Sequence, residues 1–368
     1  MGSGCEDDNC GLASGSLVDC PNQECQWEEP EFGLVKLVFL IKTSIFDIPV
    51  CVTVIYIPLM LFGLLGNILT ILVVWLRPHM RSSTYLYLSS MAVSDLFILL
   101  LLPLDLYKLW RPRPWPFGDL ACKLTMFMSE CCTFCTILHI TFLSIERYVA
   151  VCWPITAKTL VTRRRTRALI GCLWLGAAVS AAPVLVMVGV EEVVGEEPGL
   201  ESVDGGRGLP DNRECRVTDY AISSGLLSTM MILSNLYFLV PFCILGLVYS
   251  LIGRTLWLRP QSSRREQSHR HTVKMLGVIV LAFVLCWLPF HLGRTIFSLS
   301  QGGSTDGQEY FNLVSSVLFY LSAAVNPLLY NLMSARYRHA VHSLIHTHSH
   351  TQTHRRRTLT GQHSTTTL

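Results

Sequence analysis

The sequence predicts an all-α membrane protein, a seven-transmembrane helix bundle followed by a short amphipathic eighth helix. Of its 368 residues, 51% are hydrophobic and only 15% are charged, which is too apolar for an ordinary soluble domain of this size. A bilayer core needs roughly 20 consecutive apolar residues per spanning helix. Seven windows of that length lie at about 48–76, 84–107, 119–152, 168–190, 221–253, 275–297 and 310–333.

The charged residues between these windows predict the orientation of the chain. Lys and Arg are concentrated after the first, third and fifth spans, and an excess of positive charge marks cytoplasmic loops. Acidic residues gather before the first span and after the fourth. A multi-pass plasma-membrane protein with an extracellular N-terminus and a cytoplasmic C-terminus is therefore expected.

The same pattern divides the chain into four parts. Residues 1–47 form an extracellular N-terminal region and residues 48–333 the bundle. The stretch "SARYRHAVHSLIH" at 334–346 has basic and apolar residues at helical spacing, which is typical of an amphipathic helix on the inner membrane face. Residues 347–368 form a disordered cytoplasmic tail.

Six cysteines are expected on the outer side, an even number that suits an oxidising compartment. Cys122 begins the third span and Cys215 lies late in the loop after the fourth, so a disulfide between them could tie that loop to the bundle. The other four could pair in several ways. They are Cys5, Cys10, Cys20 and Cys25.

Polar residues and prolines interrupt the predicted spans. Such polar residues are costly against lipid, so they are expected to face the bundle interior. Glu146 and Arg147 stand side by side in "ITFLSIERYVAVCWP", and Asp95 lies in "SSMAVSDLFILL". A proline within a span removes one helix hydrogen bond and permits a kink.

Three stretches together resemble the motifs of rhodopsin-like, class A G-protein-coupled receptors. "SIERY" is similar to that family's acidic-Arg-aromatic motif, "CWLP" to its sixth-span motif and "NPLLY" to its seventh-span motif. The resemblance implies a receptor and not an enzyme. It also implies a set of residues for G-protein coupling and switching: Glu146, Arg147, Tyr148, Tyr249, Trp287, Phe283, Ile137, Pro241, Asn326, Pro327 and Tyr330.

By this resemblance, Glu146 holds Arg147 at the cytoplasmic end of the third span until activation frees Arg147 to meet the G protein. An arginine that merely anchors the helix at the interface is the alternative. The resemblance also implies an allosteric sodium ion, with no other cofactor. Its oxygen ligands would come from Asp95, Asn67, Thr136, Ser322 and Asn326, and a hydrogen-bond network without an ion is the alternative.

Near the outer ends of the spans, Glu130 and Arg294 would pair across a cavity and divide it. Such a site could accept a charged peptide N-terminus on one side and an aromatic or acyl group on the other. A purely structural ion pair is the alternative. The expected ligand-binding residues are Asp105, Glu130, Phe290, His291, Arg294 and Phe319, and the family resemblance implies Lys108 as a further one.

Longer stretches, including "RPWPFGDLACKL", "HTVKML" and "LFYLSAAVNPLLYNLMSARYR", resemble the ghrelin and motilin receptor family. "DLYKLWRPRPW", "LHITFLSIERY" and "VTRRRTRALI" look more like the motilin branch, whereas the short loop at 191–219 is similar to the ghrelin branch. The implied function is a receptor for a gut peptide hormone, motilin or a motilin-like peptide. Ghrelin is the alternative. A Gq-type G protein, phospholipase C and calcium release would follow.

Other partners are expected at the tail and at the bilayer. Receptor kinases and arrestin could act on Ser364, Thr365, Thr366 and Thr367, and the last residues could bind a PDZ domain. No nucleic acid is expected. A transporter would show inverted repeats, and a metal-dependent membrane enzyme would need clustered intramembrane His and Asp residues, and the sequence has neither pattern.

Overall fold

The computed structural model describes residues 31–192, 212–258, 264–299, 306–333 and 337–344. The chain divides into two compact units, Met1–Ile48 and Pro49–Leu368. Within the described residues, seven helical stretches are long and apolar enough to cross a membrane, which confirms the predicted seven-helix bundle. They are Pro49–Leu76, Ser83–Trp110, Gly118–Cys152, Arg163–Met187, Leu226–Leu258, Gly277–Ile296 and Phe311–Asn331.

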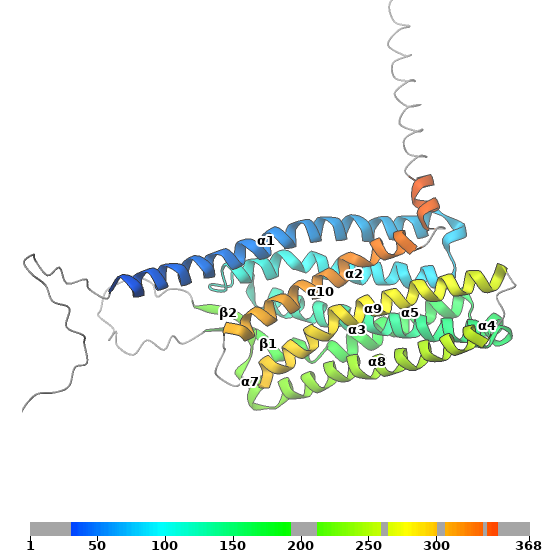
Figure 1. Cartoon of the computed structure of the whole chain (residues 1–368). Helices are drawn as coiled ribbons and strands as arrows, with labels where there is room; N and C mark the ends of the chain where they lie inside the picture. Colours follow the sequence, from blue (N-terminus) through cyan, green and yellow to red (C-terminus); the bar gives the residue numbers. More distant parts are fainter. Residues whose placement is uncertain (1–30, 193–211, 259–263, 300–305, 334–336, 345–368) are drawn as a thin grey trace, which may run out of the picture. The chain divides into compact units, whose positions relative to one another are not determined.

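The helices extend beyond the apolar windows because polar residues continue them past the hydrocarbon region. α9, for example, begins at Arg264, well before the apolar window that starts at 275. The elements in chain order are α1 (Glu31–Leu76), the 3-10 helix η1 (Pro78–Met80), α2 (Ser83–Trp110), α3 (Gly118–Cys152), α4 (Pro154–Leu160), α5 (Arg163–Ala181), α6 (Val184–Met187), β1 (Val188–Glu192), β2 (Arg213–Val217), α7 (Asp219–Ser223), α8 (Leu226–Leu258), α9 (Arg264–Leu299) and α10 (Asp306–Met333) (Figure 1).

Several predictions fall on residues outside these ranges. The four N-terminal cysteines, Cys5, Cys10, Cys20 and Cys25, and the Ser/Thr cluster at 364–367 are among them. Residues 337–344 are helical, with Tyr337 and Ala340 buried. The amphipathic helix at 334–346, whose other residues lie outside the described ranges, stays a prediction.

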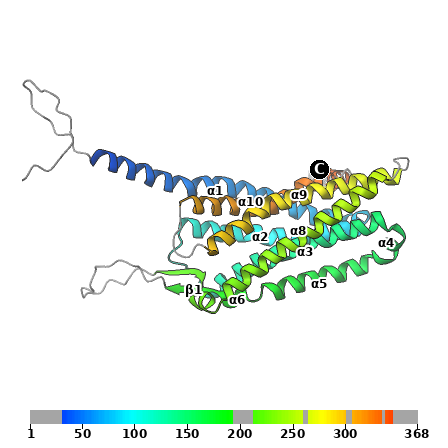
Figure 2. The ribbon, with the colours of Figure 1, turned by 60° about the horizontal axis from the view of Figure 1, so that its bottom comes forward.

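Helix α3 is the centre of the bundle. It packs against α2, α5 and α8 along its length. In its most apolar window 67% of the residues are buried, against 22% for the span at Arg163–Met187. The strands β1 and β2 lie at one end of the bundle, called here the hairpin end, and α4 lies at the other, called here the α4 end (Figures 1 and 2). One helix therefore connects both ends.

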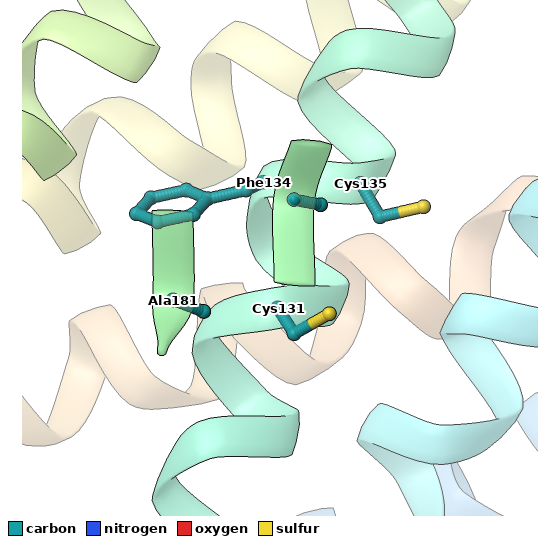
Figure 3. Packing of buried hydrophobic residues seen from close by; sticks show 5 residues of the cluster. Cys131, Phe134, Cys135 and Ala181 are labelled. Atoms are coloured by element: carbon teal, nitrogen blue, oxygen red, sulfur yellow. The ribbon is translucent and has the colours of Figure 1, made fainter. Parts of the chain in front are cut away.

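Small residues on α5 let it approach α3 closely. Cys131, Phe134 and Cys135 of α3 pack against Ala177 and Ala181 of α5, and all five are buried (Figure 3). Close approach of backbones at small side chains is a common basis of helix association in membranes, where the hydrophobic effect between helices is weak.

Helix α1 approaches α10 through glycines. A Cβ atom on Gly66 would lie 2.8 Å from Cβ of Pro327, and one on Gly63 would lie 2.9 Å from Cβ of Ala324. Asn67 extends this contact, because its Nδ2 donates to the carbonyl oxygens of Gly63 (2.9 Å) and Ala323 (3.0 Å). The predicted intramembrane asparagine thus joins two helices.

At the hairpin end, β1 and β2 pair antiparallel, with Val190 opposite Cys215. The disulfide between Cys122 and Cys215 fixes β2 to the start of α3, so the predicted disulfide is confirmed. A backbone hydrogen bond from Trp115 N to Arg213 O (2.8 Å) holds the α2–α3 connection against the other side of β2.

Candidate functional site

Glu130 of α3 and Arg294 of α9 form an ion pair at the hairpin half of the bundle. Arg294 Nη1 donates to Glu130 Oε2 at 2.7 Å, and the Glu130 side chain is only 8% exposed. The second carboxylate oxygen, Oε1, is buried and accepts no hydrogen bond from the described residues. The pair that the sequence predicted is therefore present, and within the described part of the chain Oε1 is left as an acceptor for a ligand.

A cluster of aromatic rings adjoins this ion pair through Phe290. Phe290 stacks on Phe319 with 4.8 Å between ring centroids, and the Arg294 guanidinium lies 5.7 Å from the Phe290 ring. Phe319 also meets Trp287 edge-on at 5.3 Å, and the His291 ring stacks with Trp287 at 6.1 Å. Four of the seven predicted ligand-binding residues, namely Phe290, His291, Arg294 and Phe319, are linked by these ring contacts, and Glu130 joins them through its ion pair.

Asp105 and Lys108 of α2 contact different parts of the site. Asp105 accepts a short hydrogen bond from the Tyr320 hydroxyl, and the Tyr320 ring contacts Phe319 edge-on at 5.1 Å. Lys108 instead places its ammonium 5.3 Å from the Trp115 ring, beside the disulfide. The sequence prediction missed Tyr320, which connects Asp105 to the aromatic cluster.

Deeper in the bundle, Asp95 is 1% exposed and its Oδ2 accepts a hydrogen bond from Asn326 Nδ2 at 2.9 Å. Thr136 shares a 2.5 Å hydrogen bond with Ser94. Together with Ser322, Thr136 and Asn326 line a small cavity beside Trp287. Carboxylate, hydroxyl and amide oxygens are donors that suit a hard cation such as sodium.

The remaining residues of the predicted sodium set are used in the bundle itself. Ser322 Oγ donates to the Phe319 carbonyl oxygen at 2.6 Å, and Asn67 donates to two backbone carbonyls as described above. Asn67 Oδ1 is buried and has no hydrogen-bond partner among the described residues. The donor set fits a cation, and the sodium site stays a prediction.

At the α4 end, Arg147 Nη2 donates to Glu146 Oε1 at 2.5 Å. The two side chains are only 17% and 9% exposed, so this is a half-enclosed pair and not a surface one. Ser83 of α2 donates to the other carboxylate oxygen at 2.7 Å and bonds Thr166 of α5 at 2.7 Å. Ser83 of α2 therefore holds Glu146 directly and Thr166 of α5 supports Ser83, and the sequence prediction missed both hydroxyl residues.

Two tyrosines of the predicted coupling set, Tyr249 and Tyr330, lie on other helices, α8 and α10. The Tyr249 hydroxyl contacts Ser144 at 3.5 Å. Tyr330 is buried, and its hydroxyl bonds none of the described residues. Its ring faces Tyr337 edge-on at 6.4 Å, while the Tyr337 hydroxyl bonds Thr70 of α1 at 2.9 Å. Tyr148 packs on a buried cluster formed by Val151, Val248, Ile252 and Leu256.

The residues between the two ends form a buried aromatic stack. Phe283 lies 5.6 Å from Trp287 and 6.3 Å from Phe238, centroid to centroid. Ile137 and Pro241, the other members of the predicted packing switch, are buried in α3 and α8. The stack continues through Trp287 to Phe319 and Phe290, so side-chain contacts connect the ion pair at Glu130 with the middle of the bundle.

Comparison with known proteins places this arrangement in a family. Residues 66–330 match the family model "7 transmembrane receptor (rhodopsin family)". The growth hormone secretagogue receptor type 1 of Oryctolagus cuniculus is 51% identical over 304 residues, and that of Homo sapiens 50% over 304 residues. The motilin receptor of Homo sapiens is 44% identical over 336 residues. Each alignment covers 80% of this chain and 80% of the relative.

These matches replace the transporter and enzyme alternatives, because the matched proteins are receptors and not enzymes. They also imply an extracellular peptide ligand and a G protein as partners, in a multi-pass protein of the plasma membrane. The chain belongs to the rhodopsin-like, class A family of G-protein-coupled receptors, in the group that contains the growth hormone secretagogue (ghrelin) and motilin receptors.

Proposed function

We propose that this chain is a cell-surface receptor for a motilin-type peptide hormone and that it signals through a Gq-type G protein, phospholipase C and calcium. In this proposal the hairpin end and the N-terminus face the outside, and the α4 end and the C-terminus face the cytoplasm. The basic residues that follow the first, third and fifth spans support this orientation.

The observation that carries the ligand part is the buried pair of Glu130 and Arg294 beside the Phe290 and Phe319 stack. A buried carboxylate with one oxygen that bonds none of the described residues is suited to a ligand ammonium, because a charge-assisted hydrogen bond is strong where water is excluded. The stacked rings offer an apolar surface beside it. A peptide with a charged N-terminus next to an aromatic residue combines both features.

Two observations bear on the choice between motilin and ghrelin, and they point in different directions. Three stretches near Asp105, His139 and Arg164 resemble motilin receptors. The overall identity is higher to the growth hormone secretagogue receptors, at 50–51%, than to the human motilin receptor, at 44%. We keep motilin as the first candidate because the local stretches include the one that contains Asp105 and Lys108, and ghrelin as the second.

The pair of Glu146 and Arg147 supports the coupling part of the proposal. A pair that Ser83 of α2 holds, with Thr166 of α5 behind it, can keep Arg147 from a cytoplasmic partner, and its release would expose a cation to that partner. We extend the proposal to an allosteric sodium ion at Asp95. Receptor kinases and arrestin would act on the C-terminal Ser/Thr cluster.

Calcium mobilisation in cells that express this chain tests the proposal. Motilin, octanoylated ghrelin and unacylated ghrelin are applied separately, and the G protein is identified with a Gq-selective inhibitor. A motilin response that the inhibitor abolishes is expected. A response only to octanoylated ghrelin would move the chain to the second candidate, and a response that survives the inhibitor would contradict Gq coupling.

Charge-reversal variants test the site itself. Glu130→Arg and Arg294→Glu should each raise the peptide concentration needed for half-maximal response, and combining them should restore part of the potency if the pair acts as a unit. Glu192→Gln, an exposed residue of β1, is the matched control. Unchanged potency in both single variants would leave the pair as a structural one.

A further inference from the structure

Thr295, the residue after Arg294 in α9, forms a polar contact with Asn235 of α8. Asn235 Nδ2 donates to Thr295 Oγ1 at 3.0 Å, and the Thr295 hydroxyl lies 3.2 Å from Asn235 Oδ1. The same hydroxyl lies 2.8 Å from the carbonyl oxygen of His291. A hydroxyl has one proton, so it donates to one acceptor at a time. The bond from the Asn235 amide persists in either case.

The contact is one of two on successive turns of the same helix pair. Four residues before Thr295, the His291 ring stacks on Phe238 of α8 with 4.8 Å between centroids and 24° between planes. Arg294 lies between these two contacts in the sequence of α9. Its side-chain direction therefore depends on how this part of α9 is rotated against α8.

Contacts with α8 can fix this segment of α9 because Pro289 precedes it in the helix. A proline removes one backbone hydrogen bond and weakens the link between the helical segments on its two sides. Asn235 and Thr295 are only half-buried in apolar spans, where a carboxamide without a partner is costly. The two residues are consequently expected to stay bonded and to hold the segment in place.

We propose that Asn235 and Thr295 are positioning residues for the ligand site: their hydrogen bond sets the rotation of the hairpin-end segment of α9 and thereby keeps Arg294 within reach of Glu130. This inference rests on the proposed ligand site for its effect on potency. Its effect on the ion pair does not depend on any ligand, so the two can fail separately.

The test uses substitutions that change the hydrogen bond and little else. Asn235→Leu and Thr295→Val remove it with similar side-chain volume, and Thr295→Ser keeps the hydroxyl. Ser250→Ala on α8 is the matched control, because Ser250 is exposed and, among the described residues, its hydroxyl donates only to the carbonyl of Gly246 in its own helix. All variants are full-length receptors, counted at the cell surface before assay.

Asn235→Leu and Thr295→Val should each raise the half-maximal motilin concentration about three- to tenfold, the range expected for one interhelical hydrogen bond in a membrane. Thr295→Ser and Ser250→Ala should stay near the wild-type value. In the Glu130→Gln background, Thr295→Val should have no further effect, because Arg294 then has no carboxylate to reach. Octanoylated ghrelin is the probe if motilin is silent.

A measurement without ligand tests whether the hydrogen bond and the ion pair are coupled. The melting temperature of the detergent-solubilised receptor is measured for Glu130→Gln, Thr295→Val and the double variant. The double variant should melt above the temperature that the two single losses predict when added. Additive losses would overturn the positioning role. If no peptide activates the wild type, the proposed function fails, while non-additive melting still supports the positioning pair.

Discussion

Replacing Glu146 by glutamine should make the receptor active without ligand. Its carboxylate holds Arg147 at 2.5 Å and accepts from Ser83 at 2.7 Å, in a half-enclosed site at the α4 end. The substitution keeps the shape of the side chain but removes its charge. A hydrogen bond to a charged group contributes about 1.5–3 kcal/mol, so we take a loss of about 2 kcal/mol for the state in which Arg147 is held.

That loss can be converted into a population. About 2 kcal/mol changes an equilibrium roughly 30-fold, since each 1.4 kcal/mol is a factor of ten. If about 1% of resting receptors have Arg147 released, a typical minor-state population, the variant would have about a fifth of them released. Ser83→Ala should act in the same direction but more weakly, because it removes the hydrogen bond from Ser83 to Glu146 and leaves the Glu146–Arg147 charge pair in place.

The assay is nucleotide exchange on a purified Gq-type G protein by membranes that contain equal amounts of receptor and no peptide. The expected order of basal exchange is wild type, then Ser83→Ala, then Glu146→Gln. Glu192→Gln, exposed on β1, should behave as the wild type. Wild-type basal exchange in Glu146→Gln, together with an intact peptide response, would refute the argument that this ion pair restrains Arg147.

Further predictions concern the rest of the bundle. Arg147→Ala should abolish nucleotide exchange and leave peptide binding intact, so preserved signalling would argue for a mere interfacial anchor. Cys215→Ser should lower surface expression or peptide affinity, measured by cell-surface labelling and radioligand binding, because β2 loses its attachment to α3. Gly66→Val should lower the melting temperature because its side chain would clash with α10, while Gly253→Val, with open space around it, should lower it only slightly. Asp95→Asn should remove any effect of sodium on agonist binding, and sodium sensitivity equal to that of the wild type would exclude this site.

Hydropathy was sufficient to locate the seven spans, because a bilayer requires long apolar segments whatever their packing. The disulfide was also predictable, since compartment and position left Cys122 and Cys215 as a plausible pair. The pairing of Glu130 with Arg294 followed from charge, because two opposite charges at similar depth in a membrane are expected to meet.

The supporting contacts could not be predicted in the same way. Tyr320 bonds Asp105, and Asn235 bonds Thr295, only because of how each helix is rotated about its axis. In the sequence, Tyr320, Asn235 and Thr295 each look like an ordinary polar residue in an apolar run. Ser83 gives the same lesson at the α4 end, because its bond to Glu146 depends on the offset between α2 and α3. A single sequence records the composition of a span but not its rotation.

The buried hydroxyl of Tyr330 bears on the ligand sensitivity of this receptor. The Tyr330 hydroxyl bonds none of the described residues, and a hydrogen bond gained by such a group contributes about 1 kcal/mol. A rearrangement that brings the hydroxyl to an acceptor gains that free energy. The hormone then has to supply less binding free energy to drive the rearrangement. The same gain would raise the basal activity of the receptor in the absence of hormone. Ligand sensitivity and basal activity would thus change together through the Tyr330 hydroxyl. A substitution that gives this hydroxyl a partner in the observed arrangement would lower both.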